Sequence, residues 1–532
     1  MRLGIDFGTT RVTVAAADRG NYPVVSFECP DGAVRDWFPP LAAVGDREIR
    51  YGWEAWMVQG EPGWTVLRSL KRLLGQAGLE TRIEAGGRLL ALRELLGGLA
   101  AALKQYLLER SNLRLTNTPQ IMLGVPANSN TNQRFLTAEV FRLAGFEVLG
   151  VLNEPSAASI EFGHFHRQAG ASKGPASLLV YDLGGGTFDA SLVEADEQTH
   201  TVIASEGLET LGGDDFDELL ARLALERAGM DLESLTQAET FLLLEECRQK
   251  KEALHPNTRR ILVDLDAVRP GWGEVTVPVA DFYDACRPLV EETIHIVEDL
   301  LAVHGFSLGG ARRLDALYVT GGGSELPLVA RELRERFERR VKRSAHARSA
   351  TAIGLAIQAD AGAGYRLRDR FTRNFGVWRE ADGGARITFD VLFPKGQTLP
   401  GPGEWPLEIS RQYRPAHNIG HFRYLECSRV DETGRPAGDI TLWDEIRFPF
   451  DPALENCPDL EAVPVIRSEE ASRHVIEEAY ACDAGGAVSV TISNLTTGHS
   501  RVYRLARWAA REAPLRPGKP RSRARRSQAG SS

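Results

Sequence analysis

The chain contains no run of 18 or more apolar residues, so its sequence predicts no membrane-spanning helix. A secretory signal is not expected either, because Asp6 interrupts the N-terminus before an apolar region can form. The six cysteines form no C-x-x-C pair, and their scatter favours reduced thiols over a disulfide framework or a zinc site. Together these absences predict a cytoplasmic protein.

Two common nucleotide-binding motifs are also absent. No G-x-x-x-x-G-K-[ST] occurs, which excludes a P-loop protein. No G-x-G-x-x-G opens a helix after a strand, which argues against a Rossmann dinucleotide site. Any phosphate-binding site in this chain must therefore use a different kind of turn.

The composition is that of a soluble globular protein, with 43% hydrophobic and 25% charged residues. The length of 532 residues corresponds to about three or four domains. The net charge of −9 does not favour nucleic-acid binding by the body of the protein. Residues 511–532 are the exception, with seven Arg or Lys, one acid and many Pro, Gly and Ser. We expect a disordered tail, which is either simply solvated or an electrostatic tether to nucleic acid or acidic partners.

Strand and helix patterns alternate through residue 360, which predicts an α/β architecture. Expected helices are 92–110, 133–144, 216–228, 237–254 and a segment from about 327; expected strands lie within 1–17, 177–194 and 315–320. From 374 to 507 the segments become short, alternate in polarity and are separated by turn signals. This pattern predicts a compact all-β domain.

Three glycine-rich turns each follow a predicted strand. They are Gly8-Thr9-Thr10 after Asp6, Gly184-Gly185-Gly186-Thr187 between Asp182 and Asp189, and Gly321-Gly322-Gly323-Ser324. Glycines let successive backbone N–H groups converge on an anion, and a nearby carboxylate can hold a hydrated Mg²⁺. One such turn alone is weak evidence, but the recurrence predicts two hairpins that clamp a polyphosphate.

These turns resemble the actin–hexokinase–heat-shock-70 ATPase superfamily. Three further segments, 69–75 (SLKRLLG), 124–163 and 210–220 (TLGGDDFDELL), narrow the resemblance to the heat-shock-70 (DnaK-type) chaperone family. It covers residues 1 to about 360 and extends more weakly over 374–507, which is similar to the family's β-sandwich peptide-binding domain. No counterpart of the family's helical lid is expected after this domain. The resemblance implies an actin-like two-lobed ATPase domain at 1–362, a linker at 363–373, a sandwich at 374–508 and a basic tail at 509–532.

The resemblance also implies ATP and Mg²⁺ as cofactors, with K⁺ as a further candidate cation. The implied catalytic residues are Lys71, Glu154, Asp182 and Thr187, and the implied metal-binding acids are Asp6, Asp182 and Asp189. Nucleotide-binding positions carried over are Gly8, Thr9, Thr10, Gly184, Gly185, Gly186, Thr187, Gly212, Gly213, Lys251, Gly321, Gly322, Gly323 and Ser324. Pro126 and Arg134 match residues that relay nucleotide state toward the other domain.

Several positions depart from the family pattern. Glu325 stands where an arginine usually packs on adenine, which predicts weaker or displaced binding of the base. Arg366 and Arg368 interrupt a linker that is normally leucine-rich, and burying them would be costly. Gly150 replaces an arginine that usually helps to contact J-domain cochaperones, so that contact is expected to be impaired.

The predicted peptide site lies within residues 376–426. Phe393, Phe422 and Tyr424 are its candidate apolar contacts, with filling of the sandwich core as the alternative role for each.

The leading hypothesis is an ATP-dependent chaperone-like protein in which slow ATP hydrolysis regulates binding of extended or unfolded polypeptide, with cochaperones as further partners. The first alternative is a nucleotide-dependent regulatory or scaffold protein with low turnover and one dedicated partner. The second is a small-molecule kinase of the same superfamily, against which segment 124–163 argues. No membrane partner is expected, and nucleic acid only through the tail.

Overall fold

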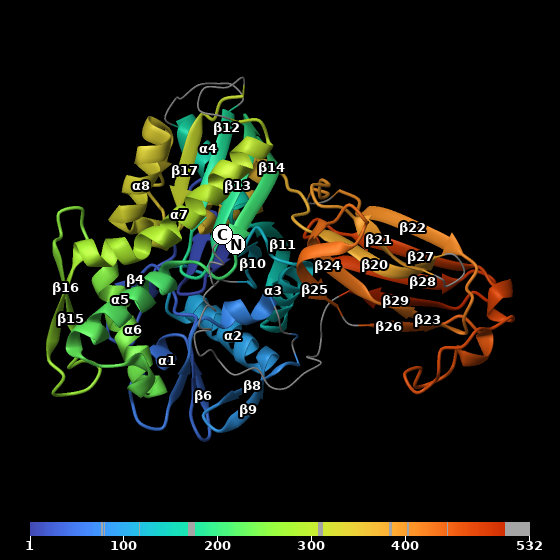
Figure 1. Ribbon diagram of the computed structural model, residues 1–532, viewed down its shortest axis with the longest axis horizontal. Helices are drawn as coiled ribbons and strands as arrows, with labels where there is room; N and C mark the ends of the chain where they lie inside the picture. The colour runs from blue at the N-terminus through green and yellow to red at the C-terminus, as the bar shows by residue number, and fades with distance from the viewer. Residues whose placement is uncertain are drawn as a thin grey trace, which may run out of the picture.

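The computed structural model describes residues 1–75, 78, 80–115, 117–168, 176–306, 312–381, 386–401, 404–443 and 445–505. The basic tail predicted at 509–532 lies outside the described residues. An α/β part made of two lobes forms one body, and a β-rich domain extends from its side (Figure 1). Among the described residues, no helix combines the length and apolar character that a bilayer crossing requires.

The first lobe is built on a four-stranded sheet in the order β11-β10-β1-β2. Its strands are β1 (Arg2–Phe7), β2 (Val12–Ala16), β10 (Gln120–Val125) and β11 (Glu147–Asn153). Strand β1 runs antiparallel to β2 and parallel to β10, so the β1–β2 turn lies at one end of the sheet. Its helices are α1 (Trp53–Met57), α2 (Leu92–Glu109) and α3 (Thr131–Leu143). Short strands complete the lobe: β3 (Phe27–Glu28), β4 (Val34–Arg35), β5 (Ala42–Val44), β6 (Ile49–Tyr51), β7 (Thr65–Leu67), β8 (Arg82–Ala85) and β9 (Arg88–Ala91).

The second lobe has a six-stranded sheet in the order β18-β17-β12-β13-β14-β19. Its strands are β12 (Ala176–Leu183), β13 (Phe188–Asp196), β14 (Thr199–Leu208), β17 (Ala316–Thr320), β18 (Val341–Arg343) and β19 (Arg366–Arg368). Helices α5 (Gly213–Ala228), α6 (Gln237–Glu252), α7 (Val279–Val303) and α8 (Pro327–Phe337) and the hairpin β15 (Arg260–Asp264)–β16 (Glu274–Pro278) complete it. The two lobes therefore have the mixed α/β architecture that the sequence predicts.

Helices α4 (Glu154–Gln168) and α9 (Ala350–Ala359) lie between the two sheets and pack on each other. Gly354 allows this contact, because a Cβ there would lie 1.8 Å from the carbonyl oxygen of Ala157. The close packing joins the lobes at their base and leaves the cleft between them open at the other end.

The linker joins the second lobe as its edge strand. Strand β19 pairs in parallel with β14, with Leu367 buried while Arg366 and Arg368 remain exposed. The cost expected from burying these arginines on docking therefore does not arise. Because side chains alternate along a strand, docking buries the leucine and leaves both charges in solvent.

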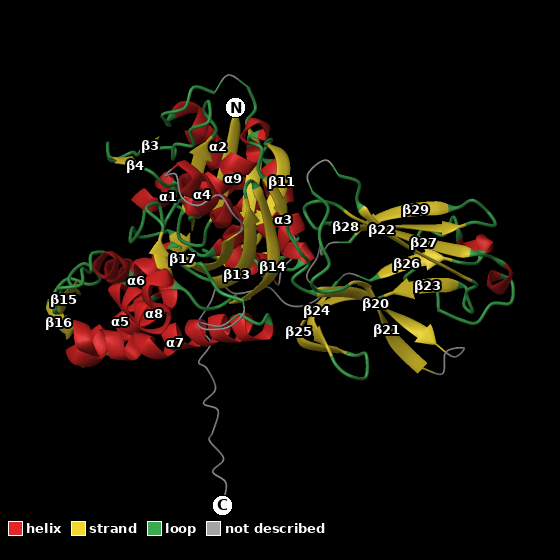
Figure 2. Ribbon diagram, turned by 90° about the horizontal axis from the view of Figure 1, so that it is seen from above, coloured by secondary structure: helices red, strands yellow, loops and turns green. Residues whose placement is uncertain are grey.

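The β-rich domain is a sandwich of two four-stranded sheets in the orders β21-β20-β24-β25 and β22-β27-β28-β29, with a separate pair β23–β26. The strands are β20 (Asn374–Ala381), β21 (Arg386–Phe393), β22 (Leu407–Tyr413), β23 (Ile419–Phe422), β24 (Tyr424–Val430), β25 (Pro436–Leu442), β26 (Ile446–Pro449), β27 (Ile476–Cys482), β28 (Val488–Asn494) and β29 (Ser500–Arg504). Figure 2 shows the two sheets edge-on beside the lobes.

The three aromatic residues proposed as peptide contacts lie in the sandwich core. Phe393 is fully buried, Phe422 is 5% exposed and Tyr424 is 1% exposed. Their rings pack with Phe375 and Phe450 in stacked, tilted and edge-on contacts. The alternative role weighed for them is therefore correct, and they are not available to a peptide as exposed contacts.

A buried carboxyl between α4 and the second sheet makes stability depend on pH. Glu161 is 1% exposed and accepts hydrogen bonds from the hydroxyls of Tyr318 and Ser344. Burial raises the pKa of Glu161 from 4.5 to about 7. Because the folded-state pKa is the higher one, the native state favours the protonated acid. The stabilising contribution of the buried Glu161 carboxyl is complete below about pH 4.5, declines between pH 4.5 and 7, and is lost above pH 7.

We expect Glu161→Gln to match the wild type near pH 4.5 and to exceed it at pH 8 by up to about 3 kcal/mol in free energy of unfolding. Urea unfolding across this pH range measures the difference, with Glu298→Gln as the exposed control. A difference between variant and wild type that does not change with pH would contradict the assignment.

Candidate nucleotide site

The first two predicted turns meet between the lobes. In the second turn, the backbone N–H of Gly184 donates to the carbonyl of Thr187 at 2.9 Å. A Cβ added at Gly185 would lie 2.6 Å from the hydroxyl oxygen of Thr10, and one at Gly186 would lie 2.7 Å from that of Thr9. Glycine is therefore needed at both positions, and the turns face each other as the clamp requires.

A cavity at this junction collects most of the residues predicted from the sequence. Its walls include Asp6, Gly8, Thr9, Thr10, Lys71, Glu154, Asp182, Gly184, Gly185, Thr187, Gly213, Lys251, Gly321, Gly322 and Gly323. Four of the predicted nucleotide-binding and metal-binding residues do not reach the wall. Gly186 packs on Thr9, Gly212 packs on Gly185, the hydroxyl of Ser324 donates to Gly321, and Asp189 accepts from Ala127.

The ion pair between Lys71 and Glu154 is the central contact of the cavity. Lys71 lies on the 3₁₀ turn η1 (Leu70–Gly75), and Glu154 is the first residue of α4. The Lys71 Nζ lies 2.5 Å from Oε1 of Glu154, and both residues are buried. Burial alone would lower the pKa of Lys71, but the carboxylates of Glu154 and Asp6 outweigh it and raise that pKa. The lysine therefore stays charged inside the cleft.

Three further carboxyl groups, those of Asp6, Asp182 and Asp189, lie close to this pair. Burial, and then repulsion by Glu154, raise the pKa values of Asp6, Asp182 and Asp189, that of Asp182 to about 8 and that of Asp189 to about 7. A cation would relieve this repulsion, so the donor set fits Mg²⁺. Among the described residues no three acids, histidines or cysteines stand close enough to coordinate one ion directly.

Lys251 is held on the second-lobe side of the cavity. Its Nζ lies 2.7 Å from Asp217 and donates to the carbonyl of Gly213 at 2.6 Å. Gly213 opens α5, and its backbone N–H bonds to Gly184 of the second turn. Helices α5 and α6 thus position the lysine beside the glycines.

The sequence reasoning missed several residues of the wall. They are Arg11, Thr13, Asp214, Asp217, Glu252, Ala347, Arg348 and Thr351. Arg11 could have been found because it directly follows the first turn, and Asp214 because it follows Gly212-Gly213. Nothing in the local sequence points to Arg348, which reaches the cavity only through the fold.

Glu325, the departure at the base position, does not stand alone. It pairs with Arg348 and, at 3.2 Å, with Arg343. Its charge is therefore balanced by arginines from other positions of the chain.

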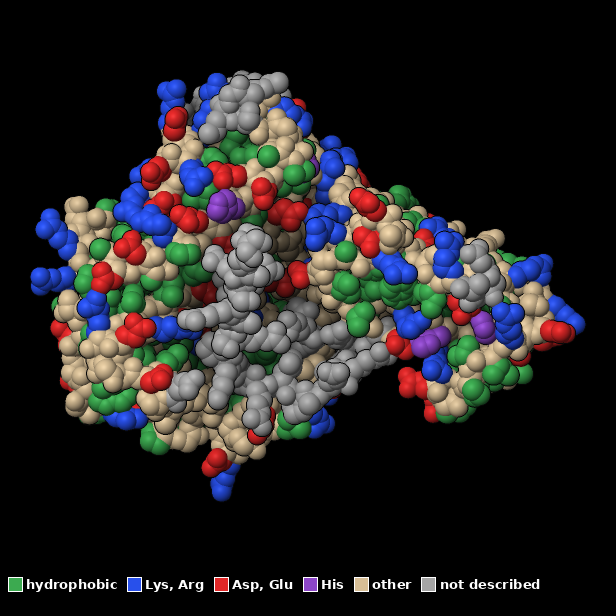
Figure 3. All heavy atoms as spheres, viewed as in Figure 1, with side chains coloured by type: hydrophobic (Ala, Val, Ile, Leu, Met, Phe, Trp, Pro, Cys, Tyr) green, Lys and Arg blue, Asp and Glu red, His purple; other side chains and the backbone are tan. Residues whose placement is uncertain are grey.

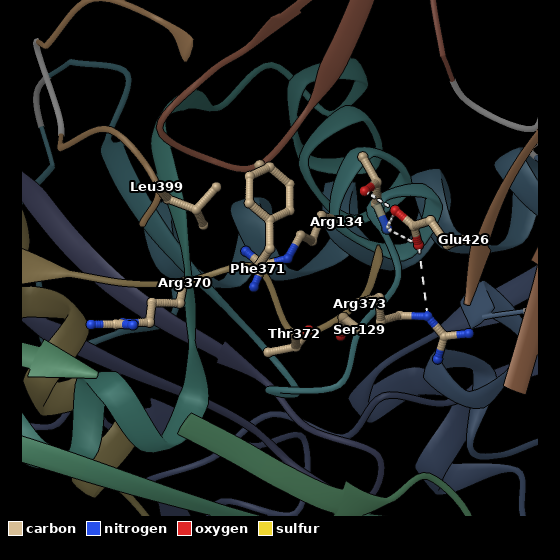
Figure 4. A pocket seen from close by; sticks show the side chains of 10 residues that line it. Ser129, Arg134, Arg370, Phe371, Thr372, Arg373, Leu399 and Glu426 are labelled. Atoms are coloured by element: carbon tan, nitrogen blue, oxygen red, sulfur yellow. Dashed lines mark hydrogen bonds and ion pairs between the residues drawn. The ribbon is translucent and has the colours of Figure 1, made fainter. Parts of the chain in front are cut away.

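A second polar cluster joins the first lobe to the sandwich (Figure 4). Its small cavity is lined by Ser129, Thr131, Arg134, Arg370, Phe371, Thr372, Arg373, Leu399, Glu426 and Gly486. Glu426 of β24 accepts hydrogen bonds from the backbone N–H, at 3.1 Å, and the hydroxyl of Thr131 at the start of α3. Burial raises the pKa of this carboxyl.

Arg134, predicted as a relay residue, lies in the same cluster. Its guanidinium donates to the side chain of Asn153 and, at 3.3 Å, to the carbonyl of Gly485 in the sandwich. Asn153 in turn donates to Asp369 of the linker at 2.8 Å. Burial lowers the pKa of Arg134 and raises that of Asp369, so each charge depends on the other.

Pro126, the other predicted relay residue, lies in the turn that leads from β10 to α3. Its carbonyl accepts from the backbone N–H of Ser129 at 3.0 Å, and the neighbouring Ala127 N–H donates to Asp189 of the second lobe at 2.9 Å. This turn therefore connects an acid beside the cleft to the helix that contacts the sandwich.

Two α/β lobes that close over glycine turns and buried acids, followed by a β sandwich, define an actin-like nucleotide-binding fold. A protein-family model described as "Hsp70 protein" matches residues 96–371, just over half of the chain. The chain therefore belongs to the Hsp70 family.

The relatives carry the name chaperone protein HscA. The protein from Klebsiella pneumoniae (strain 342) is 31% identical over 376 residues, 68% of this chain and 58% of the relative. The homologue from Aeromonas salmonicida (strain A449) is 32% identical over 380 residues, 67% of this chain and 57% of the relative. The homologue from Vibrio cholerae serotype O1 (strain M66-2) is 30% identical over 521 residues, 94% of this chain and 76% of the relative. The matched region thus spans somewhat over half the length of the first two.

Proposed function

We propose that this chain binds and hydrolyses ATP between its two lobes and uses nucleotide state to regulate its binding of extended polypeptide. The observation that carries the proposal is the buried Lys71–Glu154 pair beside Asp6 and Asp182, at the point where two glycine turns meet. Phosphoryl transfer requires mainly positioning and neutralisation of charge. A fixed ammonium, acids suited to hydrated Mg²⁺ and converging backbone donors meet that requirement.

Each group has a defined role in the proposed reaction. The glycine turns and the hydroxyls of Thr9, Thr10 and Thr187 would bind phosphate oxygens. Lys71 would neutralise charge that develops on the transferred phosphoryl group, and Glu154 would orient the attacking water. Asp6 and Asp182 would hold hydrated Mg²⁺, which when bound supplies further charge neutralisation. We assign Asp189 to a further cation, with K⁺ as the candidate.

The sandwich is the proposed polypeptide-binding part. Its first sheet carries an apolar outer face, where Ile387, Ile440 and Leu442 are 54%, 49% and 57% exposed beside the buried Phe389 and Leu425. Figure 3 shows apolar side chains gathered on this part of the sandwich. Apolar surface on a sheet whose edge strands are β21 and β25 suits an extended polypeptide that adds as a strand.

The proposal includes the finer assignments made from the sequence. They are the division at 1–362, 363–373, 374–508 and 509–532, a cytoplasmic location, and cochaperones as partners with impaired J-domain contact. Family membership favours the chaperone function over the regulatory and kinase alternatives.

ATP hydrolysis by the purified full chain, with and without a reduced unfolded polypeptide, tests the proposal. We expect slow turnover that rises when the polypeptide is added. Absence of turnover in the presence of Mg²⁺ would refute the proposed ATPase. Turnover indifferent to polypeptide would refute the coupling and point to the regulatory alternative.

A further inference from the structure

The outer end of the cleft carries a chain of ion pairs that crosses from one lobe to the other. Arg11 follows the first turn in the first lobe, while Glu252 ends α6, Arg348 precedes α9 and Glu325 lies on the turn η3 (Gly322–Glu325). Arg11 Nη2 donates to Oε2 of Glu252 at 2.5 Å, and Arg348 Nη1 donates to the same oxygen at 3.2 Å. Arg348 also donates through Nε to Glu325 at 2.5 Å. One carboxylate oxygen thus connects two guanidinium groups from opposite sides of the cleft.

The guanidinium groups of Arg11 and Arg348 are planar, so a ligand can stack on their faces. Arg11 and Arg348 line the same cavity as the phosphate-binding turns. The Arg11 guanidinium carbon lies 4.9 Å from the ring centre of Trp37, and this cation–π contact helps to hold the group in place. Arg348 is bound to Glu252 and Glu325 through its edge N–H groups, and edge contacts leave the faces of a guanidinium free for stacking.

We propose that Arg11 and Arg348 are base-binding residues that stack on the purine base of the nucleotide, one from each lobe. Trp37, Glu252 and Glu325 are positioning residues that hold the two guanidinium groups. The inference rests on the proposed function, which puts the phosphates at the glycine turns of the same cavity. It also gives Glu325 a role: the guanidinium at this end of the cleft comes from residue 348, and Glu325 holds it there.

The guanidinium groups of Arg11 and Arg348 lie too close together for a base to fit between them without displacing an existing contact. Because both donate to one oxygen, their donor nitrogens lie no farther apart than the two bond lengths combined. A planar base between two stacked groups needs about 7 Å, twice an ordinary van der Waals contact. Binding of the base therefore parts the two groups and replaces the contact between Arg11 and Glu252. Stacking does not depend on the hydrogen-bonding groups of a base. Such a site would therefore prefer a purine because of its larger flat area, without distinguishing one purine from another.

The test compares ATP with inorganic tripolyphosphate, which has no base. Isothermal titration of the full chain in Mg²⁺ measures both affinities. We expect Arg11→Ala and Arg348→Ala each to weaken ATP binding about 10-fold or more and to leave tripolyphosphate binding within about twofold. Arg11→Lys should resemble Arg11→Ala, because lysine keeps the charge but lacks the planar surface. It also serves as the second variant if the alanine protein fails to fold.

Arg50→Ala is the matched control. Arg50 also stacks on a tryptophan, Trp64 at 4.6 Å, and pairs with Glu48 at 2.8 Å, but it is not part of the cavity wall. It should change neither affinity.

The remaining outcomes of the titrations would each contradict a different part of the argument. Equal losses for ATP and tripolyphosphate would show that the arginines act on phosphate and would overturn the inference, as would unchanged ATP affinity. Wild-type protein that binds tripolyphosphate as tightly as ATP would overturn the base contact and leave the phosphate site standing. Binding of neither ligand would refute the proposed function and this inference with it.

Discussion

Replacing Lys71 with methionine is expected to lower the rate constant of ATP hydrolysis by about 100- to 1,000-fold. Methionine keeps the buried stem but removes the charge that stands 2.5 Å from Glu154. The phosphate-binding turns are separate parts of the chain, so ATP affinity should change by only about threefold. Single-turnover hydrolysis and equilibrium ATP binding measure the two quantities separately. Lys71→Ala should give the same result.

Lys250→Met is the control for this experiment. Lys250 lies next to Lys251 on α6, but it is 37% exposed and pairs at the surface with Glu246. Thermal unfolding of both variants shows whether loss of the buried charge affects folding. If the methionine protein folds poorly, Glu154→Gln tests the same pair from its other side. Near-normal turnover in a folded Lys71 variant would refute its catalytic role.

Arg134→Ala is expected to release the sandwich from the first lobe. The change removes the hydrogen bonds to Asn153 and to Gly485 and leaves Asp369 buried without its counter-charge. Breaking a buried charged contact from one side costs about 3–5 kcal/mol, enough to shift the docking equilibrium strongly. We expect a larger radius of gyration in small-angle scattering and faster proteolysis within 363–373.

Arg142→Ala provides a matched control on the same helix. Arg142 is 47% exposed and pairs with Glu139 at the surface of α3, so its loss should leave the scattering unchanged. Adding Asp369→Asn to Arg134→Ala should restore part of the docking, because both buried charges are then absent. Scattering of Arg134→Ala that matches the wild type would refute this role for the arginine.

The sequence alone determined the turns and the α/β plan of the lobes. A strand that ends in an acid followed by Gly8-Thr9-Thr10, or by Gly184-Gly185-Gly186, is a local pattern whose geometry depends on neighbouring residues. Helices α2 and α6 were likewise predicted to within about two residues, because periodicity and capping act over a few turns. Family resemblance then indicated the partners of these turns.

Tertiary structure decided which distant residues meet. Lys71 and Glu154 are 83 positions apart, and tertiary packing, including that of η1 against α3, brings their charges together. Arg348 compensates for Glu325 because the turn before α9 passes beside η3, a contact between segments with no local signal. The burial of Phe393 and Leu367 was likewise decided by tertiary packing. Burial depends on which surface covers a side chain, and that surface is formed by strands far away in the sequence.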